Sequence, residues 1–441
     1  MKNRLFAEID NAPLVLFRIF LGFLLACECF GAIATGWVKE NMVTPQVTFS
    51  HIGMQWLQPL PGYGMYYYFV IMGLLGLMVM AGFKYRFSIG LFTVMWAGSY
   101  FVQKTSYNNH YYLLMLVCLI MFFLPAHRYA SVDAVRNPRI KKLTMPAWCS
   151  WVMIVQVTIV YFFATIAKFY PGWLDGTFTK NLLERAVTNT TLHNIFIQKW
   201  FYLFIAYAGI AFDLLVVPLL LFKKTRTIAF VASLIFHLFN SITLQIGIFP
   251  FFALSFVVFF YPPEKIRKIF FRKKPPVIQG NTTYEYKNIL YCFFIPYIII
   301  QLILPLRHHL IKGDVLWTEE GHRLSWRMML RNRNGHTHFK VIDKATGKEL
   351  FYPINHRLTA KQRNGMVTKP DMIWQTAQLI KQEFNAQGKE VAVYADSHAS
   401  INMGPYHRLI DHKTDLASAK WDYFSHCDWI LLYDKNGNII K

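Results

Sequence analysis

The chain has 441 residues, of which 54% are apolar and 16% are charged, against roughly 25% charged residues in an average soluble domain. This composition excludes a disordered chain and a small fold held together by disulfides. Lysine and arginine total 46 against 24 aspartates and glutamates, for a formal net charge of +22. The basic residues crowd short loops between apolar runs, which indicates membrane anchoring rather than a nucleic-acid partner.

Long apolar runs, each about the length that crosses a bilayer core, dominate the first 305 residues. They span residues 13–35, 64–83, 87–102, 111–125, 147–167, 201–222, 228–245, 247–260 and 288–305. The third and the eighth are short and could be re-entrant. The sequence therefore predicts a polytopic α-helical membrane protein with about 8–9 transmembrane segments over residues 1–305.

The loops between these segments alternate in charge. Every second loop is basic, including Lys84 and Arg86, the stretch 128–142, Lys223 to Arg226 and the stretch 265–274. Because basic loops stay in the cytoplasm, this alternation predicts a cytoplasmic N-terminus. An odd number of crossings then puts residues 306–441 on the extracytoplasmic side.

Residues 306–441 read as a small soluble α+β domain. Alternating apolar residues predict a strand over 323–331, and a hairpin over 338–352 would turn at Lys344 to Gly347. Apolar residues at helical spacing predict a helix over 369–388, and residues 390–395 read as a further strand.

Several ionisable or polar residues fall within the apolar segments, where they are costly and therefore candidates for function. The predicted topology places most of them toward the extracytoplasmic side: Glu28, His110, Lys168, His237 and Asn240, with Asp213 in mid-span and Arg18 deeper. We expect one site near the outer leaflet, covered by the C-terminal domain.

Each of these residues also has a structural interpretation. Lys168 could extend its amine to the interface, and His110 could be an interfacial histidine. Arg18 could form an ion pair with Glu28 or Asp213, while His237 and Asn240 could hydrogen-bond between helices.

A lysine at the edge of an apolar cavity is disfavoured as a cation, and its neutral amine is a usable general base. A neighbouring histidine and asparagine could stabilise a developing anion. The sequence has no HExxH zinc helix, GxGxxG loop, Walker loop or nucleophile elbow, and His308-His309 and His336-x-His338 are weak metal signals. We therefore expect no metal, nucleotide or haem.

Blocks of residues from about 12 to about 432 resemble the vitamin K-dependent γ-glutamyl carboxylase family. They are Phe17-Arg18 with Gly22-Phe23-Leu24 and Glu28; Lys104 to His110; Arg128 to Asp133; Ile159 to Ala164 with Lys168 and Trp173 to Gly176; Asp213; Phe236 to Ser241; Ile246 to Phe249; Leu304-Pro305 with His308 and Ser325 to Met329; and Tyr394, Asp396 and Ser400 to Asn402.

The resemblance implies an enzyme that uses reduced vitamin K, O2 and CO2. In that family a lysine deprotonates the hydroquinone, oxygenation produces a strong base, and the base removes a γ-proton from a peptide glutamate. The carbanion then attacks CO2, and vitamin K epoxide is the second product. The family's lysine falls on Lys168 and its histidine on His110.

Further site residues follow from the same resemblance. Asn109 would lie beside His110, and His237 and Asn240 would contact the quinol. Met328 and Met329 would cover the quinone ring. His322, Trp326 and His426 fall in segments that match the glutamate-binding side. The implied partners are the lipid bilayer, a glutamate-containing peptide or protein, and a quinone reductase that regenerates the hydroquinone.

The chain also departs from the family pattern. Ala167 precedes Lys168 where animal members have a second lysine, position 426 is histidine instead of arginine, and the extracytoplasmic part is shorter. We expect a bacterial inner-membrane enzyme. Two alternatives remain: a quinol oxygenase that does not carboxylate glutamate, and a non-catalytic binding or transport protein in which Arg18, Glu28 and Asp213 line a pathway.

Overall fold

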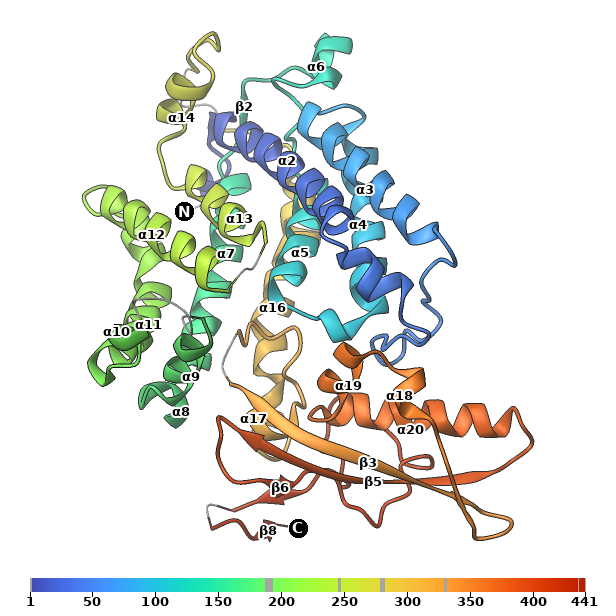
Figure 1. The fold of residues 1–441 in the computed structure, drawn as a ribbon. Helices are drawn as coiled ribbons and strands as arrows, with labels where there is room; N and C mark the ends of the chain where they lie inside the picture. The colour runs from blue at the N-terminus through green and yellow to red at the C-terminus, as the bar shows by residue number, and fades with distance from the viewer. Residues whose placement is uncertain are drawn as a thin grey trace.

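A helical body and a smaller sheet domain at one end of it make up the protein (Figure 1). The computed structural model describes residues 2–186, 193–244, 247–277, 282–328, 331–434 and 436–440. At the end opposite the sheet domain lie α6 (Val132–Arg136) and α14 (Pro263–Phe270) (Figure 1). The basic loops meet there: the Lys84 N–H donates to Asp133 at 2.8 Å, and Asn11 N–H donates to the Leu143 carbonyl at 3.1 Å.

Five helical stretches among the described residues are long and apolar enough to cross a membrane. They are α2 (Ala12–Ala34), α3 (Gly64–Ala81), α7 (Trp148–Ala167), α11 (Lys199–Leu221) and the run Lys287–Leu310, which comprises α15 (Lys287–Ile289), η5 (Leu290–Phe294), α16 (Ile295–Ile303) and η6 (Leu304–Leu310). The chain is therefore a helical membrane protein, as predicted.

The remaining predicted segments also fall on helices, although these are shorter or less apolar than the five above. They are α4 (Tyr85–Val102), α5 (Asn109–Phe123), α12 (Arg226–Leu244) and α13 (Phe249–Ser255), which continues into η4 (Phe256–Phe259). Shorter elements connect the helices: α1 (Lys2–Leu5), β1 (Glu8–Asp10), η1 (Lys39–Val43), η2 (Lys104–Ser106), η3 (Pro138–Ile140), β2 (Thr144–Pro146), α8 (Pro171–Leu174), α9 (Thr177–Ala186) and α10 (His193–Phe196).

Glycine allows α2 and α3 to cross at close range. A Cβ atom built on Gly22 would lie 2.3 Å from the backbone nitrogen of Met80, and one built on Gly76 would lie 2.7 Å from the backbone nitrogen of Ala26. Small residues at such crossings are how membrane helices gain packing contacts. The α2–α3 pair therefore depends on the absence of side chains at these two positions.

Gly22→Ala should destabilise the protein by about 3 kcal/mol, the upper end of the usual overpacking range, because the neighbouring backbone cannot move aside as a side chain would. The thermal unfolding midpoint in detergent measures this effect. Gly31→Ala is the matched control in the same helix, since a Cβ there meets nothing within 4 Å. Equal midpoints for the two variants would contradict the close crossing.

The sheet domain contains one four-stranded antiparallel sheet in the order β4-β3-β5-β6. Its strands are β3 (Arg333–Asp343), β4 (Glu349–Leu350), β5 (Val391–Ile401) and β6 (His407–Arg408), and β7 (Leu432–Tyr433) pairs with β8 (Ile439–Ile440). Arg333 pairs with Ile401 and Asp343 with Val391, which fixes the register of the central strands. The helices of this region are α17 (Val315–Thr318), α18 (Ile354–Arg357), α19 (Ala360–Met366) and α20 (Pro370–Asn385).

Apolar residues of α20 pack on the sheet, which explains the helical spacing in the sequence. Ile373, Ala377 and Ile380 share one buried cluster with Val393 and Ala395 of β5. The predicted helix at 369–388, the strand at 390–395 and the hairpin turning at Gly347 are thus present.

The predicted strand over 323–331 is wrong. Leu324 and Trp326 have left-handed backbone angles, with φ of 59° and 58°, so the segment turns instead of extending. Its alternating apolar residues arise for another reason: Leu324, Trp326 and Met328 pack into the core of the helical body. The segment thus joins the two parts of the protein.

Candidate active site

A cavity of 170 Å³ lies within the helical body, among α5, α7, α9, α11, α12 and α13. Six of the residues singled out in the sequence line it: His110, Lys168, Asp213, His237, Asn240 and Met328. The rest of its wall is mainly apolar and aromatic. Charged and polar groups in such a cavity interact strongly, because little water screens them.

Lys168 forms an ion pair with Asp213 in this cavity. Lys168 ends α7, and its Nζ donates to the Asp213 carboxylate of α11 and, at 3.3 Å, to the carbonyl of Ala164. Both residues are buried. The Trp173 ring centroid lies 5.3 Å from the ammonium, and its indole N–H is fixed by the Ala206 carbonyl at 3.0 Å. The amine is therefore held inside the cavity instead of reaching the interface.

His237 of α12 presents a free ring nitrogen beside this pair. Its Nε2 lies 3.1 Å from the Tyr161 hydroxyl, whereas its buried Nδ1 has no hydrogen-bond partner among the described residues. The buried Thr179 hydroxyl of α9 also lines the cavity without a partner in the described chain. Buried polar atoms are normally paired, so both atoms are available to a polar ligand.

His110 forms an apolar contact with the opposite wall. Its ring stacks on Phe249 with the centroids 3.7 Å apart and an angle of 19°. Asn108 caps α5 by accepting the Tyr111 N–H at 2.7 Å, and this cap places His110 on the first turn, facing the cavity. The histidine ring and Phe249 together form a flat aromatic surface.

Asn109 does not line the cavity. Its Nδ2 donates to the Arg327 carbonyl at 3.1 Å, and its Oδ1 accepts the Tyr107 hydroxyl at 3.0 Å. Asn109 thus fixes the segment that carries Met328 over the cavity, which makes it a positioning residue. Met329 lies outside the described residues.

Arg18 and Glu28 do not join the site. Arg18 donates to the carbonyls of Ala126 and Ala130, at 3.3 and 2.5 Å, near the basic end of the protein. Glu28 accepts the Tyr111 hydroxyl at 2.7 Å in a separate cavity of 20 Å³. The ion pair of Arg18 with Glu28 or Asp213, considered as the structural alternative, is therefore wrong, because these side chains contact different groups.

The residues expected on the glutamate side have their binding groups occupied or enclosed. Trp326 is fully buried and stacks on Tyr112 with the centroids 4.8 Å apart. His426 Nδ1 lies 2.7 Å from the carboxylate of Glu320. Burial and the adjacent Arg331 lower the pKa of His322 well below its usual value, so this ring is neutral. None of the three lines the cavity.

A cluster of partly buried arginines between the helical body and the sheet domain was not predicted from the sequence. Arg331 and Arg333 pair with Glu319, while Arg323 lies 3.1 Å from Asp371. Arg327 lies 3.3 Å from His308, and burial together with Arg331 lowers the pKa of Arg327 to about 10. The sequence does carry a signal for this cluster, because four arginines lie at short intervals: Arg323, Arg327, Arg331 and Arg333. Partly buried cations that outnumber the neighbouring acids favour an anionic ligand.

Two further cavity residues, Tyr161 and Thr179, were not predicted, and the role of Asp213 differs from the structural one expected for it. Asp213 was interpreted as structural, but a buried acid needs a cation, and Lys168 supplies it. Tyr161 and Thr179 carry no signal in the sequence, since hydroxyl side chains are common both on apolar helices such as α7 and on mixed ones such as α9.

Family models match nearly the whole chain in two parts. The first, described as the HTTM domain, matches residues 6–264 and includes every helix around the cavity. The second, described as the vitamin K-dependent gamma-carboxylase, lumenal domain, matches residues 286–436. No solved structure matches the chain. The helical half with its buried lysine and the C-terminal half with its sheet thus match the two domains of one family, and the chain belongs to the vitamin K-dependent γ-carboxylase family.

Proposed function

We propose that this protein is an integral-membrane carboxylase that oxygenates a reduced naphthoquinone to its epoxide. It would use the base so formed to carboxylate a peptide glutamate with CO2. The observation that carries the proposal is the buried Lys168–Asp213 pair in an aromatic cavity. A proton acceptor away from water is what deprotonation of a phenolic hydroxyl requires.

The cavity supports binding of a flat diol. Aromatic side chains of His110, Phe249 and Trp173 supply its walls, and the unpartnered His237 Nδ1 and Thr179 hydroxyl supply polar contacts. Its 170 Å³ is below the roughly 300 Å³ of the smallest usual ligand pockets, so it suits a ring system alone. A long isoprenoid chain would extend from it into the bilayer.

Lys168 and Asp213 would act as one unit. The pair carries no net charge, and it can take one proton from a quinol hydroxyl to become an ammonium beside a neutral carboxylic acid. The ammonium then stabilises the phenolate, and the Trp173 face stabilises the ammonium. Reduced vitamin K, once oxygenated, supplies the strong base for the γ-proton, and the apolar walls keep water away from it.

The peptide glutamate would enter from the sheet domain. The cations of residues 323–333 are suited to attract a carboxylate. We further propose that eight or nine segments cross a bacterial inner membrane with the N-terminus in the cytoplasm. The basic loops gather at the end opposite the sheet domain, and this supports that orientation (Figure 1). A quinone reductase would regenerate the substrate.

A quinol oxygenase without carboxylation is the second candidate. It is favoured by the enclosed Trp326 and by His426, whose ring is engaged by the chain's own Glu320. Both residues were expected to contact the substrate glutamate.

One assay separates the candidates. Purified protein in detergent receives reduced vitamin K, labelled CO2 and a short glutamate peptide in air, and epoxide and fixed label are measured together. Formation of epoxide together with fixed label supports the carboxylase. A peptide with glutamine in place of glutamate gives the background level of fixed label. Epoxide without label over a series of glutamate peptides supports the oxygenase. Neither product from folded protein would contradict both candidates.

Asp213→Asn should lower the rate of quinol oxidation by roughly 10²-fold, the lower end of the range for proton-transfer groups, because Lys168 remains but loses its carboxylate. Stopped-flow or epoxide assays at saturating quinol measure kcat. Asp175→Asn is a control, since Asp175 lies outside the cavity and caps the Thr177 N–H at 2.8 Å. An unchanged kcat for Asp213→Asn would contradict the proposed unit.

A further inference from the structure

A second hollow in the helical body lies apart from the candidate active site. It is an apolar groove of 810 Å³ at the surface, formed by α2, α12, α13 with η4, and α14. Helix α13 separates it from the cavity: Phe249 and Ala253 face the cavity, whereas Phe251 and Leu254 face the groove. Phe23 and Phe251 are about half exposed along it. Nothing in the proposed function uses this groove.

The groove ends among cations. Lys265 lines it at the start of α14, with its ammonium 4.7 Å from the centroid of the Tyr261 ring, which also lines the groove. The Arg226 guanidinium lies 5.5 Å from the centroid of the same ring. Two cations over one aromatic ring repel each other, and an anion between them would relieve the repulsion.

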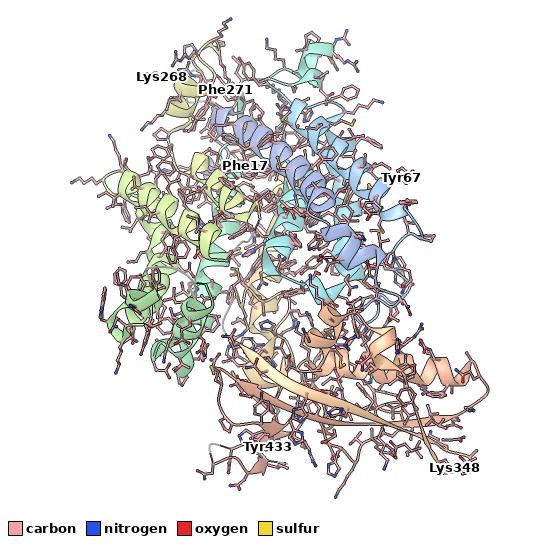
Figure 2. All side chains as sticks on the ribbon, viewed as in Figure 1. Phe17, Tyr67, Lys268, Phe271, Lys348 and Tyr433 are labelled. Carbon is pink, nitrogen blue, oxygen red and sulfur yellow. The ribbon has the colours of Figure 1, made fainter. Side chains whose placement is uncertain are left out.

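The surrounding loop is strongly basic. Asp10 forms ion pairs with Arg267 and Lys274. The rest of residues 263–274 contains four cations and one acid, namely Lys265, Lys268, Arg272 and Lys273 with Glu264. Figure 2 shows Lys268 and Phe271 at the extremity of the helical body, far from Lys348 and Tyr433 of the sheet domain. Exposed Ile269 and Phe270 lie beside these cations, so α14 has the character of a helix at a membrane interface.

We propose that this groove binds one anionic diacyl phospholipid, with an acyl chain along Phe23 and Phe251 and the phosphate near Lys265 and Arg226. The apolar lining suits an acyl chain, and the cationic end suits a negative headgroup. Basic residues on the cytoplasmic side of membrane proteins favour anionic lipids in the same way. The site is independent of the quinol reaction.

Native mass spectrometry of the full chain in detergent tests the site with phosphatidylglycerol and with phosphatidylcholine of identical acyl chains. Wild-type protein should retain one phosphatidylglycerol in preference to phosphatidylcholine. Lys265→Gln should weaken phosphatidylglycerol binding about fivefold, since each basic residue near the headgroup contributes about that factor. Lys265 is exposed, so folding is not at risk.

Lys84→Gln is the matched control, because Lys84 also lies over an aromatic ring at the basic end but outside the groove. Leu234→Trp, which fills the groove, should displace the lipid while leaving the cations in place. Equal binding of the two lipids by wild-type protein, or an equal loss in Lys84→Gln, would overturn the proposal. Retention of the lipid by Leu234→Trp would also overturn it.

Discussion

Lys168→Met should lower the rate of quinol oxidation by roughly 10²- to 10⁴-fold while the protein still folds. Methionine matches the length of the lysine stem and removes only the amine, so the cavity keeps its shape. The amine contacts the Asp213 carboxylate and lies over Trp173, and its removal breaks the proposed unit and leaves the phenolate without the ammonium that would stabilise it. Epoxide formation under single-turnover conditions measures the chemical step directly.

Lys180→Met is the control for this variant. Lys180 is nearly half exposed on α9, pairs with Glu184 at 3.7 Å, and is not part of the cavity wall. It should retain wild-type turnover. Wild-type turnover in Lys168→Met, with a normal unfolding transition, would remove Lys168 from the mechanism and contradict the proposed Lys168–Asp213 unit.

The role of His110 in the same site can be tested separately. His110→Ala removes the ring that stacks on Phe249, whereas the Lys168–Asp213 pair is untouched. If the ring only positions the quinol, KM should rise more than kcat falls; if it stabilises charge in the transition state, kcat should fall. The split between the two constants therefore assigns its role.

Hydropathy was sufficient to locate the helices. Each of the nine predicted segments falls on a helix. In lipid, a helix is how a single apolar segment can hydrogen-bond its own backbone N–H and C=O groups. The cost of charge in a bilayer was also sufficient to find Lys168 and Asp213. Both kinds of prediction depend on composition along the chain and not on contacts between distant residues.

The sequence did not predict which groups these side chains contact. Which way Asp213 or Glu28 faces depends on the rotation of its helix, and a uniformly apolar helix gives no periodicity from which to infer it. Arg18 shows a second limit, since its acceptors are the backbone carbonyls of Ala126 and Ala130, which every residue type has. The segment at 324–328 shows a third: its alternation reflects packing on the helices, not a strand.

The junction between the two domains depends on a buried carboxylate at the start of α20. Asp371 accepts from Lys104 of η2 at 2.6 Å and from Arg323 at 3.1 Å, and all three are buried or largely buried. Burial alone would raise the pKa of Asp371, but Arg323 and Lys104 outweigh burial and hold this pKa well below its usual range. Burial lowers the pKa of Lys104 to about 8, so its ammonium stays protonated at pH 7.

Asp371→Asn should therefore destabilise the protein by about 3–5 kcal/mol at pH 7, because it leaves two buried cations without their carboxylate. A carboxyl group whose pKa is lower in the folded state than in the unfolded state stabilises the fold. Its full contribution is present at pH values above the unfolded-state pKa of about 3.9, and it is lost as the pH falls from there toward the folded-state pKa. The difference in unfolding midpoint between wild type and variant should thus shrink below about pH 4.

The exposed pair of Lys340 and Glu349, 4.0 Å apart on the sheet, provides the comparison. Glu349→Gln should cost less than about 1 kcal/mol, because water screens both charges and holding the side chains together has an entropic cost. The segment from Lys104 to His110 runs from this junction to the cavity wall, so Asp371→Asn should also weaken quinol turnover, while Glu349→Gln should not. If the two variants unfold at the same temperature, the Asp371 carboxylate does not hold the domains together.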